Sequence, residues 1–447
     1  MTNLISFRNN LSLSIIIFYP ILFILGPALL NIFTLLFVLL NFDRITFPLK
    51  RKREKFILIS FFIFILYCLV VSFTAYDVVS SIRRSISFLI HGFFFLILWS
   101  YSDLEINHKK FIKILLISIL LVNSFVLIDT TIQFVIGKDL FNYEAHRYRL
   151  SGPFNDELVV GSYLYKFSII SFASLLTLIN KPKFYVTFYV IISLLIITLS
   201  GERASIILFL FSLLFLILIF KLGSLKKYLK YFFLLVLMVS VVITIVFKSE
   251  NVKIFKFNDA SYIDGKRNEI LLKEKNNNIS NFNYRIFWIF DRLIIQTTND
   301  ILNFKNSSYF ALFKSASFTW QNNKLIGVGL KNFRISCQKT NLNIKDNNYP
   351  TCSTHPHNYI LEILSELGLI GLILFCIFGL SISRKIYIFN RNKSEYNYLS
   401  KSLIVVLLAI MFPFLPTGSF FSTFNSSFFW YFLSILFYLI GLNDKKI

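Results

Sequence analysis

Long apolar runs separated by short polar segments recur along most of the chain. Because roughly 20 apolar residues suffice to cross the hydrocarbon core of a bilayer, these runs predict about 12 membrane-spanning helices. The runs lie at residues 12–26, 28–42, 56–74, 85–100, 113–135, 157–179, 184–199, 204–221, 231–248, 358–382, 402–416 and 425–441.

Composition supports the same fold class. The chain is 56% hydrophobic, with a mean hydropathy of +0.67, which is too apolar for a soluble globular protein. We therefore predict an all-α polytopic membrane protein. The first run has one basic residue before it, Arg8, and no small-residue cleavage site after it, so we interpret it as a retained span and not as a signal peptide. No internal repeat is evident.

The net charge of +23 is informative because of where the basic residues lie in the chain. The basic residues cluster between apolar runs, a pattern that fits membrane topology better than nucleic-acid binding. Alternate connections are rich in Lys and Arg, and the positive-inside rule places these connections and both chain ends in the cytoplasm. Arg83 and Arg84, on the opposite side, are exceptions.

This topology divides the chain into three parts. We expect about nine spans over 1–248, a large periplasmic loop over 249–356, and about three spans over 357–447. Within the loop, helical spacing of apolar residues predicts amphipathic helices at 284–302 and 309–322.

Polar residues of unusual type gather where the loop meets the next apolar run. His355, Pro356 and His357 precede Asn358, a natural helix cap. Read as a helix from there, Asn358, Glu362, Ser365 and Glu366 share one face, which must turn away from lipid. His357 is either a general base for an acceptor hydroxyl or a histidine bonded to a neighbouring loop.

Arg203 lies in a turn so short that its side chain must sit at the membrane edge. It either grips a phosphate or diphosphate, or reaches to lipid headgroups or pairs with Glu202. Arg149 is a weaker candidate of the same kind, and Arg285 and Arg334 in the loop are further ones.

Two of the four cysteines lie in the loop, and both precede the histidines. In an oxidising periplasm, Cys337 and Cys352 are expected to form a disulfide. The alternative is a metal site made by these cysteines with His355 and His357. We favour the disulfide.

These residues together resemble the O-antigen ligase and O-antigen polymerase family of bacterial membrane glycosyltransferases. The resemblance rests on His357-Asn358 with the downstream Glu366, Gly368 and Gly371, on Gly327-Val328-Gly329, and on Ser200-x-x-Arg203, and it covers residues 190–380. It departs from the family pattern in one place, because the stretch 309–324 lacks the second loop arginine that family members usually carry ahead of the Gly-x-Gly turn.

The resemblance implies a fold of the GT-C kind in the bacterial inner membrane, with an active site facing the periplasm. It implies glycan transfer from undecaprenyl diphosphate with inversion, without metal or other cofactor, with His357 as the base and Arg203 on the donor diphosphate. The candidate substrate-binding residues are Arg149, Arg285, Arg334, His355, Asn358 and Glu366.

The acceptor decides the activity. If the acceptor is lipid A–core the protein is a ligase, which the His-Pro-His-Asn segment favours; if it is a second lipid-linked repeat unit the protein is a polymerase. A protein acceptor is a further alternative. A rival from another class is a flippase or exporter of lipid-linked oligosaccharide, which predicts charged residues spread along the spans. Here the charged candidates Arg149, Arg203, His357 and Glu362 gather towards one membrane face, as in a site.

Overall fold

The computed structural model describes residues 2–45, 54–146, 148–179, 183–220, 282–340, 352–391 and 395–445. Over these residues the fold is all-helical, as predicted, and the only β-type pairing described is an isolated bridge between Lys138 and Glu144. Each predicted apolar run in the described residues overlaps a helix, but the run at 402–416 extends too far, because the helix there ends at Ile410 and residues 411–416 form a loop. The run at 231–248 lies outside the described residues, as do residues 249–281 and 341–351 of the predicted loop.

Six of the described helices are long and apolar enough to cross a membrane, and four further apolar helices are shorter. These helices support a membrane protein. The count of about 12 spans stays a prediction.

The chain forms two compact units. Unit 1 consists of Met1–Ile119 and Thr298–Ile447, and unit 2 of Leu120–Thr297. The described helices of unit 1 are α1 (Thr2–Leu25), α2 (Pro27–Leu40), η1 (Phe42–Ile45), α4 (Lys55–Ser72), α5 (Val78–Ser100), η3 (Tyr101–Asp103), η6 (Phe304–Asn306), α14 (Ser308–Asn322), α15 (Phe333–Thr340), α16 (Tyr359–Arg391), α17 (Asn397–Ile410) and α18 (Thr423–Asp444). Those of unit 2 are α7 (Val160–Leu178), α8 (Lys183–Leu199), α9 (Arg203–Phe220), α12 (Phe282–Phe290) and the π-helical turn η5 (Asp291–Gln296). Two helices, α6 (His108–Ile136) and α13 (Thr297–Leu302), contain the boundaries between the units.

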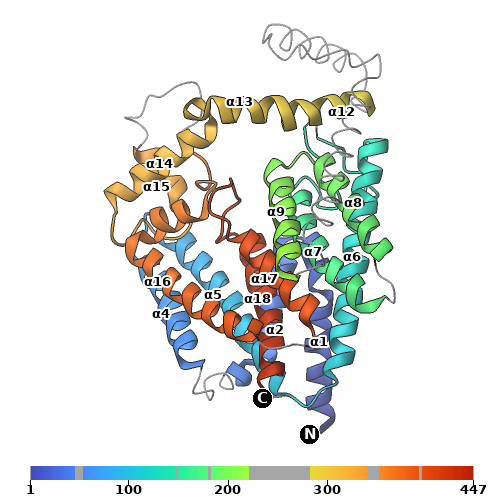
Figure 1. Cartoon of the computed structure of the whole chain (residues 1–447). Coiled ribbons are helices and arrows are strands. Elements are labelled where there is room, and N and C mark those ends of the chain that lie inside the picture. The colour runs from blue at the N-terminus through green and yellow to red at the C-terminus, as the bar shows by residue number, and fades with distance from the viewer. Residues whose placement is uncertain are drawn as a thin grey trace. The chain divides into compact units, whose positions relative to one another are not determined.

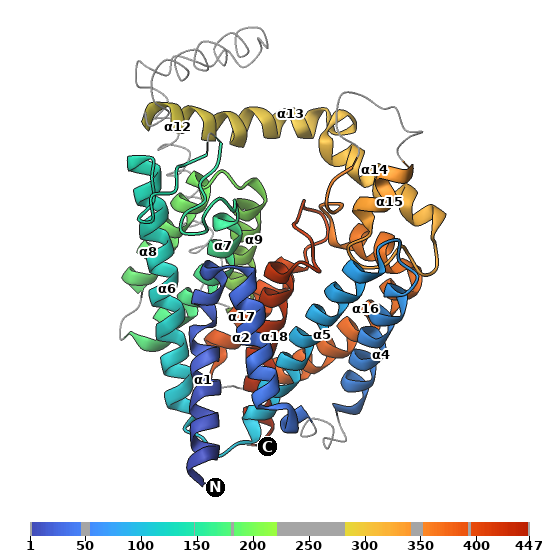
Figure 2. The ribbon, with the colours of Figure 1, turned by 180° about the vertical axis from the view of Figure 1, so that it is seen from behind.

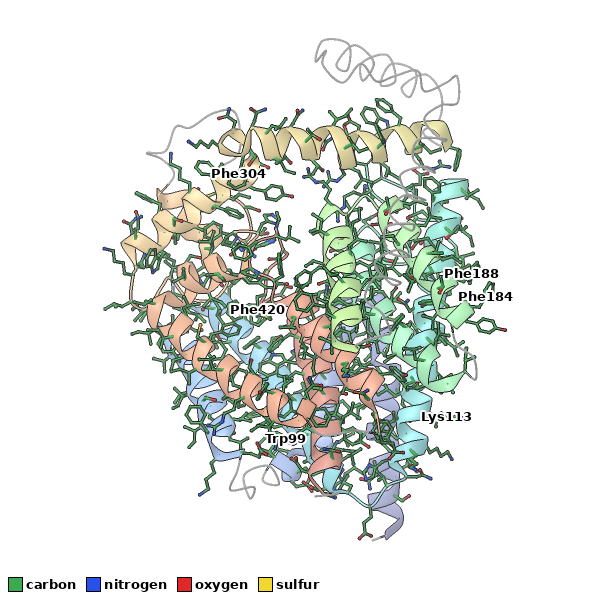
Figure 3. The ribbon with its side chains drawn as sticks, in the orientation of Figure 1. Trp99, Lys113, Phe184, Phe188, Phe304 and Phe420 are labelled. Atoms are coloured by element: carbon green, nitrogen blue, oxygen red, sulfur yellow. A yellow bond between two sulfur atoms is a disulfide. The ribbon has the colours of Figure 1, made fainter. Side chains whose placement is uncertain are left out.

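The core of unit 1 is built around α18, which packs chiefly on α5 and α17 (Figure 1). The Trp430 ring lies within 5.4–5.7 Å of the rings of Phe61, Phe88 and Phe95. Trp99 of α5 meets Phe437 edge to face at 4.9 Å (Figure 3). Edge-to-face and tilted aromatic pairs add to the free energy of packing, so the many phenylalanines fill this core.

Local sequence fixes where several helices of unit 1 begin. Asp77, Ser307 and Ser422 accept hydrogen bonds from the backbone amides of Ser80, Phe310 and Asn425, at 3.0, 3.2 and 3.2 Å. Each cap satisfies one of the amides that the first turn leaves unpaired.

One end of unit 1 carries its ion pairs. Arg8 pairs with Asp43 at 3.1 Å, Lys385 with Glu54 and Asp444, Lys445 with Asp103, and Lys109 with Glu395. The two chain ends also lie here, whereas α14 and α15 lie at the opposite end of the unit in both ribbon views (Figures 1 and 2). These ion-paired cations of the described residues therefore gather on the side that carries both termini.

Helix α16 is broken at Gly368, whose φ of +69° and ψ of −170° are not helical. The segment 324–329 pairs with the break. Its amides at Val328 and Gly329 donate to the carbonyls of Ser365 and Glu366, at 3.0 and 2.8 Å. Its carbonyls at Lys324 and Leu325 accept from Leu369 and Ile370, at 2.9 and 3.1 Å. The backbone groups freed by the break are thus bonded to another segment.

This pairing explains the glycines of the two motifs. A Cβ on Gly368 would lie 2.2 Å from the Leu325 carbonyl oxygen, and a Cβ on Gly327 would lie 2.5 Å from the Glu366 carbonyl. Both glycines also have positive φ. Only glycine allows the two backbones to approach this closely.

We expect Gly368→Ala to lower the free energy of unfolding by roughly 2–3 kcal/mol, because the new Cβ clashes with backbone and the φ is strained. Thermal or denaturant unfolding of the protein in detergent measures the change. Gly379→Ala is the matched control in the same helix, since nothing lies within 4 Å of its added Cβ. Equal unfolding of Gly368→Ala and wild type would contradict the role given to the pairing.

Candidate functional site

The site in unit 1 begins where α16 starts. Asn358 caps the helix, because its Oδ1 accepts from the Leu361 amide at 3.1 Å, and its Nδ2 donates to the Pro413 carbonyl at 2.8 Å. The residue before it, His357, has a φ of +55°, which is unfavourable for a residue with a side chain. Such strain persists only where neighbouring contacts hold it, so the position of His357 is imposed by its surroundings.

The contacts that hold His357 come from Thr417. The Thr417 amide donates to the His357 carbonyl at 2.9 Å, and His357 Nδ1 lies 3.1 Å from the Thr417 carbonyl oxygen. Because a carbonyl oxygen only accepts, Nδ1 carries the proton and, in the neutral ring, Nε2 keeps its lone pair. Burial lowers the pKa of His357, while the bond to Thr417 opposes this shift. The ring is therefore neutral at pH 7 with a basic Nε2.

His355 lies beside it, with 4.1 Å between the ring centroids. Burial, and then the neighbouring His357, lower the pKa of His355 to about 3. Its Nδ1 is 2.9 Å from Thr354 Oγ1, and its Nε2 is buried without a hydrogen-bond partner. The pair thus offers two neutral imidazoles in contact.

A disulfide joins Cys337 of α15 to Cys352, with 5.7 Å between the Cα atoms. Cys337 is fully buried against Ala316 and Phe333. The bond therefore fastens the segment that leads to His355 onto α14 and α15. With the two sulfurs bonded to each other, the four-ligand metal site has lost its thiolates; within the described residues no group of three or more His, Cys, Asp or Glu is arranged to hold a metal ion.

Glu362, one turn after Asn358, is 2% exposed. Its carboxylate accepts from the Ser419 hydroxyl and, at 2.7 Å, from the Phe420 amide. Both donors belong to the loop between α17 and α18 that also contains Thr417. The Phe420 ring fills the space between helices, 5.3 Å from the ring of Tyr359 and 5.8 Å from that of Phe88 (Figure 3).

Sequence reasoning missed this loop. The pattern placed Glu362 on the inward face of α16 but did not identify a partner for it. Pro413, Pro416 and Gly418 predict a turn, and nothing in them indicates a donor for a buried carboxylate. The signal that could have found the loop is the buried charge, since such a carboxylate requires donors from another segment.

Glu366 holds a different segment. Its carboxylate accepts from the amides of Lys331 and Phe333, at 2.8 and 3.3 Å, and so binds the start of α15. Arg334 of α15 and Arg84 of α5 are its electrostatic neighbours. Sequence reasoning treated Arg84 only as an exception in the topology, although a cation beside an apolar run was a usable signal.

In unit 2, Arg203 is the first residue of α9 and donates through Nη1 to Thr297 Oγ1 at 3.3 Å. Arg149 pairs with Glu202 at 3.1 Å and also donates to the Leu158 carbonyl. Glu202 in turn accepts from the Gly161 amide at 3.0 Å and the Ser205 hydroxyl at 2.9 Å. The short turn is therefore held by an ion pair and two further bonds.

Arg285 binds the end of α6. Its Nε donates to the Phe134 carbonyl at 2.8 Å and its Nη2 to the Val135 carbonyl at 2.6 Å. A cation at these carbonyls satisfies backbone acceptors that the helix leaves free and complements its dipole.

The predicted residues thus fall into two groups. Unit 1 brings together His355, His357, Asn358, Glu366, Arg334 and the disulfide, and unit 2 contains Arg149, Arg203 and Arg285. The structure adds Glu362, Arg84 and the loop at Thr417 to the first group.

The protein is therefore an all-helical membrane protein that carries a polar site. In unit 1 this site contains a neutral histidine, buried carboxylates and arginines. A family model described as O-antigen ligase matches residues 188–376, and this match confirms the resemblance drawn from the sequence. The family covers O-antigen ligases and polymerases, glycosyltransferase-like enzymes that act on a lipid-linked glycan and a lipid acceptor. The flippase alternative is not favoured. A comparison with curated proteins gives no match.

We expect Glu362→Gln to lower the free energy of unfolding by about 1–3 kcal/mol, because each carboxyl oxygen accepts one hydrogen bond and glutamine keeps only one of the two oxygens. Limited proteolysis in the loop between α17 and α18 should become faster in parallel. Glu395→Gln is the control: this residue is partly exposed and its pair with Lys109 is worth about 0–1 kcal/mol. If the two variants lose equal stability, Glu362 does not hold the loop.

Proposed function

We propose that the protein is a membrane glycosyltransferase that moves a glycan from undecaprenyl diphosphate to an acceptor at the periplasmic face. We assign it as an O-antigen ligase of lipopolysaccharide biosynthesis, with lipid A–core as acceptor; an O-antigen polymerase, which joins lipid-linked repeat units, is the alternative in the same family. The observation that carries the proposal is His357, a neutral histidine fixed by Thr417 so that Nε2 is basic.

In the proposed reaction, His357 Nε2 takes the proton of an acceptor hydroxyl as its oxygen attacks the anomeric carbon of the donor sugar. The bond between that carbon and the diphosphate oxygen breaks, and the diphosphate leaves with the electron pair. Attack from the opposite side inverts the configuration at the anomeric carbon. Arg203 stabilises the charge that develops on the diphosphate, so the scheme requires no metal ion.

Several candidate substrate-binding residues have protein partners that support a positioning role. Asn358 binds the Pro413 carbonyl and Glu366 binds the start of α15. Arg285 binds the end of α6, and Arg149 pairs with Glu202. We propose that these side chains shape the site, and that His355 packs on His357 to keep it neutral.

We propose an orientation in the membrane from the distribution of the charges. The ion-paired cations and both chain ends share one end of unit 1, opposite to α14 and α15. By the positive-inside rule we place that end in the cytoplasm. Since Tyr309 of α14 lies 6.1 Å from His357, ring to ring, the histidine then faces the periplasm of the inner membrane.

The test is glycan transfer by purified protein, in the presence of a chelator, from undecaprenyl-diphosphate glycan to lipid A–core or to a second lipid-linked glycan. We expect His357→Ala to reduce kcat by about 10²–10⁴-fold and Arg203→Ala by about 10²–10³-fold. The exposed residues His146 and Arg384 supply matched alanine controls. Normal transfer by His357→Ala would refute the catalytic assignment, and the acceptor that is used decides between ligase and polymerase.

The pH dependence of kcat/KM provides a second test. As pH falls through the pKa of His357, the ring gains a proton, Nε2 loses its lone pair and the rate falls about tenfold per pH unit. Because burial lowers that pKa below the usual value of about 6.5, we expect activity to be maintained at pH 6.5 and to fall only under more acidic conditions. An acid limb that begins above pH 6.5 would show that His357 is not the neutral base.

A further inference from the structure

A pocket outside the candidate site opens at the end of unit 1 that carries both chain ends (Figure 1). Its volume is about 360 Å³, a size typical of small-molecule sites. Three segments that are distant in sequence form its walls: the start of α6, the two residues before α17, and the end of α18. The reaction proposed above makes no use of this pocket.

Part of the wall is apolar. Ile106, Leu439 and Leu442 contribute this surface, and His108 beside them is held in place, because its Nδ1 lies 2.7 Å from the Tyr438 hydroxyl oxygen. Since α6 and α18 are both long and apolar enough to cross a membrane, residues at their ends lie at the level of the lipid headgroups. The pocket is therefore within reach of a membrane lipid.

The charged part of the wall has both signs. Lys109 pairs with Glu395 at 3.1 Å, and Lys445 pairs with Asp103 at 3.7 Å. The side chains of the two lysines are 78% and 46% exposed. Ion pairs that water reaches contribute little to stability, so these charged groups can rearrange to contact a ligand at small cost.

The mixture of signs selects among ligands. A simple anion is attracted by the two lysines but repelled by Glu395. A headgroup with both a phosphate and an ammonium group complements both signs. The apolar surface of the same pocket suits the glycerol backbone and the first acyl carbons of a lipid.

We propose that this pocket binds the headgroup of a zwitterionic phospholipid, with the phosphate on Lys109 and Lys445 and the ammonium group on Glu395. The bound lipid joins the start of α6 to the end of α18 and to the residues before α17. The proposal does not depend on the glycan-transfer reaction, because the pocket shares no residue with the candidate site.

The first test is thermal unfolding of the full chain in detergent, titrated with short-chain phosphatidylethanolamine. The lipid is expected to raise the unfolding midpoint, and inorganic phosphate at the same concentration is not. Lys445→Gln is expected to raise the apparent dissociation constant for the lipid about tenfold, since a charge-assisted hydrogen bond is lost. Lys110→Gln, an exposed lysine of α6 that does not line the pocket, is the matched control.

Two results of this titration overturn the proposal. If Lys445→Gln binds the lipid as tightly as Lys110→Gln and wild type do, the pocket is not the binding site. If inorganic phosphate raises the midpoint as much as the lipid, the ligand is a free anion and not a headgroup.

A second lipid tests the ammonium contact. Phosphatidylglycerol carries the phosphate without the ammonium group, so wild type is expected to bind it more weakly than phosphatidylethanolamine. Glu395→Gln is expected to raise the dissociation constant for phosphatidylethanolamine about tenfold and to leave that for phosphatidylglycerol unchanged or lower. Tighter binding of phosphatidylglycerol by wild type, or an equal effect of Glu395→Gln on both lipids, overturns the zwitterionic assignment.

A variant that changes no charge gives an independent check. Asn443 lines the pocket and is half-buried, so Asn443→Trp fills the space while the unfolding midpoint without lipid stays near that of wild type. We expect this variant to lose the rise with lipid; if the rise is retained, the lipid binds elsewhere and the proposal is refuted. His357→Ala is expected to keep the full rise, so failure of the proposed function leaves this site unaffected.

Discussion

The site in unit 1 depends on two carboxylates buried one helical turn apart on α16. Glu362 and Glu366 cannot be left without donors in an apolar bundle, so each takes hydrogen bonds from a separate segment of backbone. The first brings in the loop between α17 and α18, which carries Thr417 and fixes His357. The second brings in the start of α15, which carries Arg334 and is joined by its disulfide to the histidine segment. One helix thereby assembles a site from parts of the chain that are distant in sequence.

The candidate residues are distributed over the two units. Unit 1 is built from both ends of the sequence and contains the histidines, while unit 2 is inserted between them and contains Arg149, Arg203 and Arg285. In the proposed reaction these correspond to the group that activates the acceptor and the group that stabilises the leaving diphosphate.

Much of this could be predicted from the sequence, and the failures have physical reasons. Most apolar runs are long, so their helices were predicted, and so was the cap at Asn358, because a cap acts within its own helix. The run at 402–416 was extended past the end of α17, because apolar residues continue into the loop. The loop at Thr417 and the role of Arg84 were missed because they depend on tertiary contacts between residues far apart in the chain. The motif glycines were recognised, but periodicity gave no hint that Gly327 and Gly368 meet backbone to backbone; α16 reads as a continuous apolar helix.

This backbone pairing affects which amino-acid substitutions such a protein can accept. The join between segment 324–329 and the break in α16 is made by amides and carbonyls, which every residue except proline supplies. Side chains that flank the two glycines are therefore free to vary while the frame keeps its geometry. A lineage can therefore exchange residues around the site and inherit the scaffold that holds the histidine in place.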